Sequence, residues 1–306
     1  MRPGRLYDGG PRPGPFSVPL KIAPGSISAE NLQARYCMRL LILVGVGFLG
    51  SGLWAQTSPS PYDAETIVRR SVEANAINYK SLPQLDYFKV ERGEDGRTRT
   101  FEELMLFGSR YSRLLAIDGQ PLSPERQRDE RTKLSKAIQA RMNESPAERK
   151  KRVATYKSER ERDQLMLNEM ANAFDFKLAE DERLGPWDVY VLKAKPRRGY
   201  KPPNTRAKVL TGMEGTLWIE KNTFQWVKVE AQVIRPVSIE GFLARVEKGT
   251  RFELTQMPVR ENLWLPQHFS MSARARILFL FTKRDEEDES YYGYHPAAHT
   301  EPDSAP

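Results

Sequence analysis

Three histidines and one cysteine are the side chains of this 306-residue chain best suited to general-base, nucleophilic or metal chemistry. His268 could serve as a general base in a hydrolase of unrecognised type. However, the chain contains no Gly-x-Ser-x-Gly, His-Glu-x-x-His, Walker or Gly-x-Gly-x-x-Gly motif. His295 and His299 lie in a C-terminal segment that we expect to be too loose to preorganise a site. The lone Cys37 excludes a disulfide scaffold and a cysteine-based zinc site. The sequence therefore predicts no catalytic residue, no metal and no cofactor.

Aromatic residues on the expected strands suggest a second chemistry, the binding of an apolar ligand. In Phe224 to Val233, aliphatic side chains alternate with aromatic and polar ones, as in a half-buried antiparallel strand. Trp218 and Trp226 could pair across a hairpin on a partly exposed face. Alternatively, the aromatics line an apolar concavity, and the candidates for that lining are Trp187, Tyr190, Trp218, Trp226, Phe252 and Trp264.

A basic segment offers a third chemistry, the binding of anionic lipid headgroups or an acidic partner. Ser123 to Asp163 holds thirteen Lys and Arg against eight Asp and Glu. The interleaved acids also fit a solvated helical hairpin with ion pairs one turn apart. A nucleic-acid role would use the same charge, but export argues against it. The candidate surface residues are Arg126, Arg128, Arg131, Arg149, Lys150, Lys151 and Arg152.

Most of the elements that position these residues are strands. Ser60-Pro61 predicts a helix start, and the apolar stripe that follows ends at Leu82-Pro83. Three strands follow, over 84–92, 97–107 and 111–117. Residues 121–173 are expected to form a helical insertion, with a capping box at Ser145-Pro146-Ala147-Glu148. Further strands are expected over 174–181, 187–195, 213–220, 224–234, 250–258, 263–271 and 273–282. This order predicts an α+β class with one large antiparallel sheet.

The two ends of the chain differ from this domain. Residues 1–37 are rich in Gly and Pro, and we expect no packed structure there. Arg39, the apolar run 40–53 and Ala55 predict a signal peptide over 38–55, with Met38 as the true start. The alternative is an anchor in the inner membrane formed by residues 40–54. The acidic run 285–289 predicts a disordered tail over 283–306. We therefore expect an exported, periplasmic domain over 61–282.

The hairpin that begins Gly215-Thr216-Leu217-Trp218-Ile219-Glu220 and returns through Phe224 to Val233 resembles that of the periplasmic LolA/LolB-like (outer-membrane lipoprotein-sorting) superfamily. The resemblance implies an unclosed β-barrel whose helices plug the concave side around an apolar cavity. It also implies a non-enzymatic protein that carries or senses a lipid, an acyl chain or a lipoprotein. The alternative is a regulatory module that engages an envelope protein through the basic helices.

Overall fold

The computed structural model describes residues 60–93, 95–238, 244–277 and 281–298. The predicted disordered N-terminus (1–37) and signal peptide (38–55) lie outside these residues. The chain divides into two units. Residues 21–61 form one of them, and every element described below belongs to the other, which includes Tyr62–Pro306.

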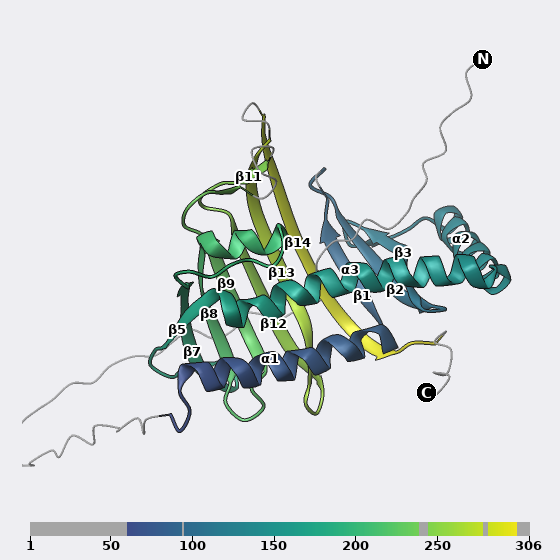
Figure 1. Cartoon of the computed structure of the whole chain (residues 1–306). Coiled ribbons are helices and arrows are strands. Elements are labelled where there is room, and N and C mark those ends of the chain that lie inside the picture. The colour runs from purple at the N-terminus through teal and green to yellow at the C-terminus, as the bar shows by residue number, and fades with distance from the viewer. Residues whose placement is uncertain (1–59, 94, 239–243, 278–280, 299–306) are drawn as a thin grey trace, which may run out of the picture. The chain divides into compact units, whose positions relative to one another are not determined.

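Within the described residues, fourteen antiparallel strands form a single sheet, whose arrangement is drawn in Figure 1. Its N-terminal part is a meander of β1 (Leu85–Arg92), β2 (Thr98–Leu106), β3 (Ser109–Ile117) and the short β4 (Gln120–Pro121). The remaining strands are β5 (Phe174–Leu178), β6 (Glu182–Leu184), β7 (Trp187–Pro196), β8 (Met213–Glu220), β9 (Trp226–Val233), β10 (Val237–Ser238), β11 (Ala244–Val246), β12 (Arg251–Arg260), β13 (Leu263–Ile277) and β14 (Phe281–Pro296).

The sheet is curved and does not close on itself. Its main path runs β4-β3-β2-β1-β14-β13-β12-β9-β8-β7-β5, so β4 and β5 are the two ends. The pairing of β1 with β14 joins the N-terminal meander to the rest of the sheet. Together with the helices, this arrangement confirms the predicted α+β class and the open half-barrel.

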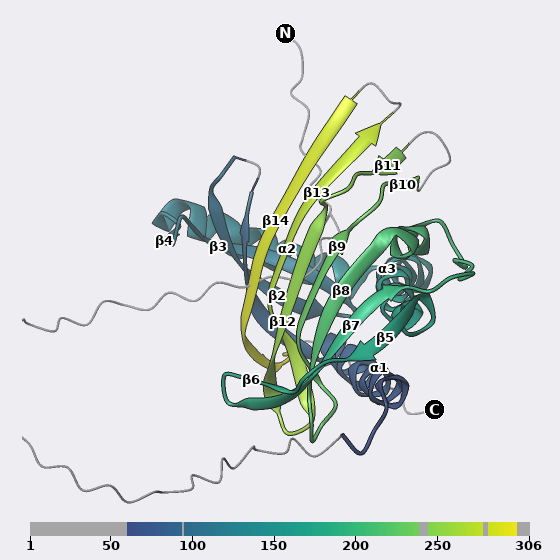
Figure 2. The ribbon, with the colours of Figure 1, turned by 90° about the vertical axis from the view of Figure 1, so that its left-hand side faces the viewer.

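Helices α1 (Ala64–Ser81) and α3 (Pro146–Ala173) run side by side across one face of the sheet (Figures 1 and 2). The short 3₁₀ helices are η1 (Leu82–Gln84) and η2 (Arg206–Gly212). The carboxylate of Asp63 caps α1 by accepting a hydrogen bond from the Thr66 N–H (2.7 Å), so α1 begins later than the predicted Ser60-Pro61 start. No helix within the described ranges is long and apolar enough to cross a bilayer.

The helical insertion begins where the sequence predicts. Ser123 caps α2 (Pro124–Asn143), and Ser145 with Glu148 forms the predicted capping box at the start of α3. In that box the Glu148 carboxylate accepts the Ser145 N–H (2.9 Å), while the Ser145 hydroxyl accepts the Glu148 N–H (3.3 Å). Both reciprocal bonds satisfy donors that a helix start leaves without partners.

The main hydrophobic core lies between the sheet and α1, α3 and η2. We call this side of the sheet the helix-covered face and the opposite side the open face. The buried apolar side chains of the helix-covered face include Ile67, Val68, Met170, Tyr190, Leu192, Leu210, Leu217, Ile219, Trp226 and Val229. The long α3 contributes few of them, and its buried apolar residues within the described part are Met170 and Ala173.

The predicted disordered tail is wrong for residues 283–296. They belong to β14, which pairs with β13 on one side and with β1 on the other. Tyr291 is 3% exposed and packs edge-on against Tyr87, with ring centroids 5.2 Å apart. The predicted strands over 263–271 and 273–282 are mostly one fifteen-residue strand, β13. Residues 299–306 lie outside the described residues.

Gly215 occupies a position in β8 where the sheet leaves no room for a side chain. A Cβ there would lie 2.5 Å from the carbonyl oxygen of Glu230 and 3.1 Å from the Cβ of Ala231. We expect Gly215→Ala to lower the free energy of unfolding by about 2 kcal/mol, because backbone atoms of β9 would have to move. Gly96→Asn is the control, since nothing lies within 4 Å of a Cβ there and Asn tolerates its positive φ. Equal thermal unfolding midpoints for the two variants would contradict this account.

Candidate functional site

The six aromatic residues predicted to line one cavity are divided between the two faces of the sheet. Tyr190 and Trp226 are buried on the helix-covered face, and Phe252 packs against the same cluster. Trp187, Trp218 and Trp264 lie on the open face, where Trp264 joins Val189, Val191 and Val227 in a separate cluster. The six side chains therefore cannot line a single cavity.

A register shift in the β8–β9 hairpin causes this division. Trp218 lies opposite Lys228, but Ile219 lies opposite Trp226, so β9 has one extra residue between these pairs. A bulge of this kind reverses the face that the following residues occupy. Trp226 therefore shares a face with Val229, and the predicted Trp218–Trp226 pair across the hairpin is wrong. The Trp218 indole instead donates to Glu182 (2.9 Å).

A small gap remains beside Trp226 in the interior between the helices and the sheet. It is lined from α1 and α3 by Val72, Asn75, Ala76, Tyr79, Gln164 and Asn168. Its volume of about 10 Å³ is the space of roughly one water molecule. Within the described part of the chain, the indole Nε1 of Trp226 has no hydrogen-bond partner. The interior beside Trp226 thus has almost no free volume, and it contains a buried N–H group without a hydrogen bond among the described residues.

Amide side chains on α1 and the β8–β9 turn hold the C-terminal half of α1 to the sheet. Asn78 Nδ2 donates to Gln225 Oε1 (2.6 Å), and Asn78 Oδ1 accepts the backbone N–H of Trp264 (3.2 Å). The Gln225 amide in turn donates to the carbonyl of Asn262 (3.2 Å). Sequence reasoning missed this network. Its signal was the helical spacing of Ser71, Asn75 and Asn78, which places polar groups on the buried stripe of α1.

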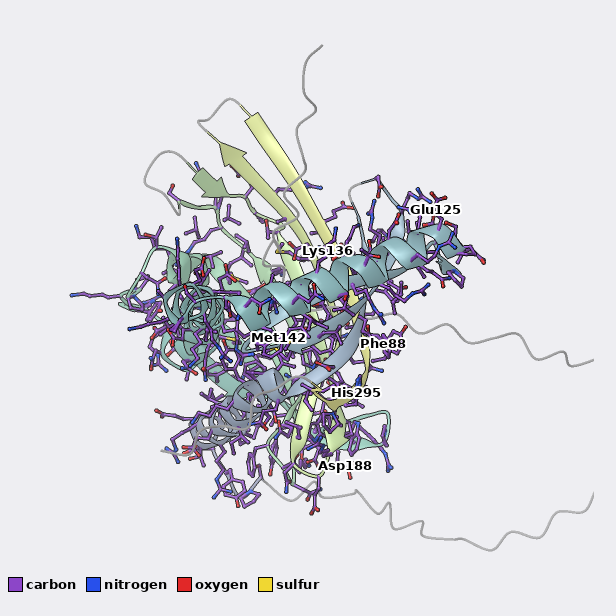
Figure 3. All side chains as sticks on the ribbon, turned by 90° about the vertical axis from the view of Figure 1, so that its right-hand side faces the viewer. Phe88, Glu125, Lys136, Met142, Asp188 and His295 are labelled. Atoms are coloured by element: carbon purple, nitrogen blue, oxygen red, sulfur yellow. The ribbon has the colours of Figure 1, made fainter. Side chains whose placement is uncertain are left out.

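The basic candidates of the helical insertion have different environments. Arg126, Arg128 and Arg131 are exposed on α2, which Figure 3 shows from Glu125 to Met142. Lys150 and Lys151 are exposed on α3, whereas Arg149 is half-buried. Acidic neighbours are interleaved as predicted, for example in the Lys133–Glu130 pair at 2.7 Å. The exposed cations remain candidates for a docking surface.

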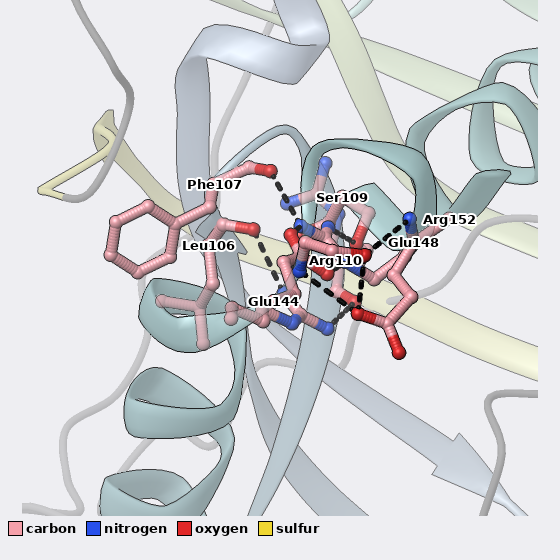
Figure 4. Close-up of polar contacts among 9 residues, drawn as sticks. Leu106, Phe107, Ser109, Arg110, Glu144, Glu148 and Arg152 are labelled. Carbon is pink, nitrogen blue, oxygen red and sulfur yellow. Dashed lines mark hydrogen bonds and ion pairs between the residues drawn. The ribbon is translucent and has the colours of Figure 1, made fainter. Parts of the chain in front are cut away.

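Arg152 serves the fold, which corrects its place among the surface candidates. Its guanidinium pairs with Glu144 and donates to the Ser109 hydroxyl (2.6 Å) and the Phe107 carbonyl (3.1 Å) (Figure 4). Arg141, which the sequence did not single out, donates to the carbonyls of Leu106 (2.9 Å), Ser109 (3.0 Å) and Arg110 (3.1 Å). These two arginines attach the helical insertion to the β2–β3 turn.

The open face carries a wide groove of about 1500 Å³. Its lining includes Lys193–Lys195 of β7. Ala194 is buried on the helix-covered face, and neighbouring residues of a strand point to opposite faces. Lys193 and Lys195, and with them the groove, therefore lie on the open face. Three of the carboxylates that line the groove are paired within the sheet. Lys228 pairs with Glu230 (2.6 Å) and Glu253 (3.1 Å), and His268 lies 3.3 Å from Asp288. The groove thus carries many more charged side chains than the interior beside Trp226, and that interior is the better match to an acyl chain.

The described residues hold no group of three or more His, Cys, Asp or Glu that could bind a metal ion. His268 contacts Asp288, and no hydrogen bond within the described residues joins it to a serine, threonine or cysteine side chain. His295 is not in a loose tail as predicted, because it belongs to β14 and lies opposite Asp86 of β1. Figure 3 shows it near Phe88, with ring centroids 6.4 Å apart. His299 lies outside the described residues.

No protein-family model and no curated protein matches the sequence. The structure is similar to an outer membrane lipoprotein-sorting protein domain from Vibrio parahaemolyticus, with 10% identity, a TM-score of 0.29 and coverage of 76% of this chain and 95% of the other. It is also similar to a DUF1329 family protein from Desulfovibrio piger, with 10% identity, a TM-score of 0.28 and coverage of 76% and 93%. A MucA/MucB complex structure from Pseudomonas aeruginosa follows, at 12% identity, a TM-score of 0.21 and coverage of 78% and 100%. The first similarity is to the type of protein that the Gly215–Val233 hairpin resembles. With TM-scores this low, these similarities assign no ligand and no partner to this chain.

Proposed function

We propose that this chain is an exported, non-enzymatic binding protein that holds an apolar chain, such as the acyl chain of a lipid or lipoprotein, between the helix-covered face and α3. The observation that carries the proposal is the gap beside Trp226, whose buried indole N–H has no hydrogen-bond partner among the described residues. Burial of an acyl chain would contribute about 0.8 kcal/mol for each CH₂ group, with no covalent step.

Access to this interior requires α3 to move away from the sheet. Only a few polar contacts restrain the middle and the C-terminal part of α3 within the described residues. Over the middle of the helix, Arg160 donates to the carbonyl of Tyr79 and lies over its ring, 4.1 Å from the centroid. Nearer the C-terminal end, the Tyr200 hydroxyl donates to Glu169 (2.6 Å). Among the α3 side chains that the structure describes, only Met170 and Ala173 are buried apolar groups, and separating these from the sheet exposes little apolar surface.

Tryptophan fluorescence in the presence of a fatty acid brominated along its acyl chain tests the proposed site, because bromine quenches only nearby indoles. We expect quenching that Trp226→Phe removes and that Trp218→Phe leaves in place, since the two indoles lie on opposite faces. The proposal fails if the brominated chain causes no quenching. It also fails if Trp218→Phe is the variant that removes it.

Arg160→Ala is expected to raise the affinity for the same fatty acid up to about 10-fold. The substitution removes a hydrogen bond and a cation–π contact that hold α3 closed, together worth about 1 to 2 kcal/mol. Lys157→Ala is the matched control, because Lys157 is exposed on the same helix. Isothermal titration with the three proteins measures the effect. Equal affinities for the two variants would show that Arg160 does not restrain α3.

The second candidate function is docking of an envelope protein on α2. None of the twenty residues of α2 is buried, and Met142 is 65% exposed. An acidic partner would bind here with strong salt dependence. Salt-sensitive binding that is lost when Arg126, Arg128 and Arg131 are changed to Gln would favour this function over lipid carriage.

A further inference from the structure

The end of β7, the loop that follows it and the start of η2 form the most basic stretch of the described chain. Between Lys193 and Lys208 there are seven Lys and Arg and no Asp or Glu. The side chains of Lys193, Lys195, Arg197, Arg198, Lys201 and Lys208 are exposed. Neither the proposed lipid interior nor α2 includes this stretch. We call the stretch, together with Lys177 of β5, the β7 basic edge.

The pairing of β5 with β7 concentrates positive charge on the open face at this end of the sheet. Figure 2 is viewed from the β5–β7 end. Lys177 lies directly opposite Lys193 in the register, and both are exposed. Like charges in this relation destabilise a sheet by a few tenths of a kcal/mol or more. The repulsion between these two lysines therefore lowers the stability of the sheet. An anion bound over the surface would screen that repulsion.

Nearby carboxylates are already engaged, so most of the described cations of this edge have no carboxylate partner within the described residues. Asp175 pairs with Arg197 (2.9 Å), Glu169 accepts the Tyr200 hydroxyl, and Glu182 accepts the Trp218 indole. Among the residues that the structure describes, no carboxylate pairs with Lys195, Arg198 or Lys201. Lys193 donates to Thr216 (3.1 Å) and lies 5.7 Å from the centre of the Trp218 ring.

We propose that the β7 basic edge docks the protein on a bilayer surface that contains anionic phospholipid. Lys193 and Lys195 line the open-face groove, but the other cations lie on β5, on the loop at the edge of the sheet and at the start of η2, outside that lining. The set as a whole is therefore spread out, and it fits an extended anionic surface better than a compact anion. Trp218, held beside Lys193, adds an amphipathic ring of the type that is enriched at membrane interfaces. Each Lys or Arg near such a surface contributes about 1 kcal/mol, or about 5-fold in affinity. This docking does not depend on acyl-chain binding beside Trp226.

Co-sedimentation of the full chain with vesicles tests the proposal. Vesicles of phosphatidylcholine alone report charge-independent binding, including any by the apolar run 40–53. Addition of roughly 30% phosphatidylglycerol should strengthen binding at low salt, and the gain should disappear at high salt. The triple variant Lys195→Gln/Arg198→Gln/Lys201→Gln should lose about 100-fold of the affinity for the anionic vesicles.

The matched control is Arg126→Gln/Arg128→Gln/Arg131→Gln, which removes the same charge from α2. Circular dichroism checks that both triple variants remain folded, as expected for exposed side chains. An unchanged loop variant, or an equal loss in both variants, would overturn the proposal. Soluble polyphosphate is the third ligand to be tested. If the loop variant loses affinity for polyphosphate while the wild-type protein ignores the vesicles, the surface binds a soluble polyanion and the bilayer proposal is wrong.

Discussion

Asp86→Ala is expected to lower the free energy of unfolding by about 3 kcal/mol. The Asp86 side chain is fully buried, and it bridges the two strands beside β1. One carboxylate oxygen accepts the N–H of Met105 in β2 (2.6 Å), and the other accepts the N–H of Ala298 just after β14 (3.2 Å). Removal of the carboxylate leaves both donors without an acceptor, and each such loss costs about 1 to 3 kcal/mol.

The position of Asp86 explains why the sheet needs this carboxylate. The β1–β2 ladder ends at the Tyr87–Glu103 pair and β14 ends at Pro296, so the N–H groups of Met105 and Ala298 lie beyond the two ladders. The side chain replaces the missing backbone acceptors there. Loss of Asp86 should therefore also increase hydrogen exchange at the end of β14.

Urea denaturation followed by circular dichroism measures this effect. Asp188→Ala is the matched control, because Asp188 is an exposed residue of β7 (Figure 3) and should change stability by less than about 0.5 kcal/mol. Asp86→Asn keeps one acceptor oxygen and should lie between the two. If Asp86→Ala unfolds at the same urea concentration as Asp188→Ala, the two hydrogen bonds do not stabilise the fold.

Glu289→Gln is expected to remove a large pH dependence of stability. Glu289 is 6% exposed on β14, and burial raises the pKa of its carboxyl to about 8. Lys89 opposes that shift in pKa from 3.4 Å away, whereas Glu91 and Glu287 increase it. Within the described structure, one Glu289 carboxylate oxygen has no hydrogen-bond partner.

The sign of the pH dependence follows from these two states of the carboxyl. In the unfolded chain the carboxyl ionises near pH 4.3. The folded protein retains the proton until about pH 8. The native state therefore binds more protons between these values, and stability falls as the pH rises through this window. The loss should be on the order of 5 kcal/mol across this whole window, since each pKa unit corresponds to about 1.4 kcal/mol. Gln cannot ionise, so Glu289→Gln should be the more stable protein at pH 9 and similar to wild type at pH 5.

Unfolding free energies measured between pH 5 and pH 9 test this prediction. Glu261→Gln is the control, because Glu261 is exposed in the β12–β13 turn and should leave the pH profile unchanged. A Glu289→Gln variant with the wild-type slope would assign the pH dependence to another group. A flat wild-type profile would show that Glu289 is not buried in the protonated form.

Local sequence signals were sufficient for most of the individual elements. Ser123-Pro124 and the Ser145–Glu148 capping box predicted two helix starts at the correct residues, because a cap is a contact within one turn of a helix. Alternation and turn residues predicted β1, β2, β3, β7, β8 and β12 near their observed bounds. An antiparallel sheet followed from the short connections between neighbouring strands.

Other features depend on contacts between residues far apart in the chain. The acidic composition of residues 285–289 suggests a solvated tail, but β13 and β1 offer backbone partners on both sides, and Tyr291 can be buried against Tyr87. β1 and β14 are separated by about two hundred residues, and no local pattern encodes that pairing. Likewise, the bulge before Trp226 exchanges the faces of the tryptophans, and only the register between β8 and β9 reveals it.

The sequence by itself determined the class of the fold, the helical insertion with its caps and the excess of positive charge over 123–163. These are properties of composition and of contacts within a few residues. Only the tertiary structure decided which aromatics share a face, that Arg152 holds the insertion to the β2–β3 turn, and that Asp86 of β1 and Glu289 of β14 are buried. Burial and facing depend on the partner strand, and a strand's partner is selected by the packing of the whole sheet.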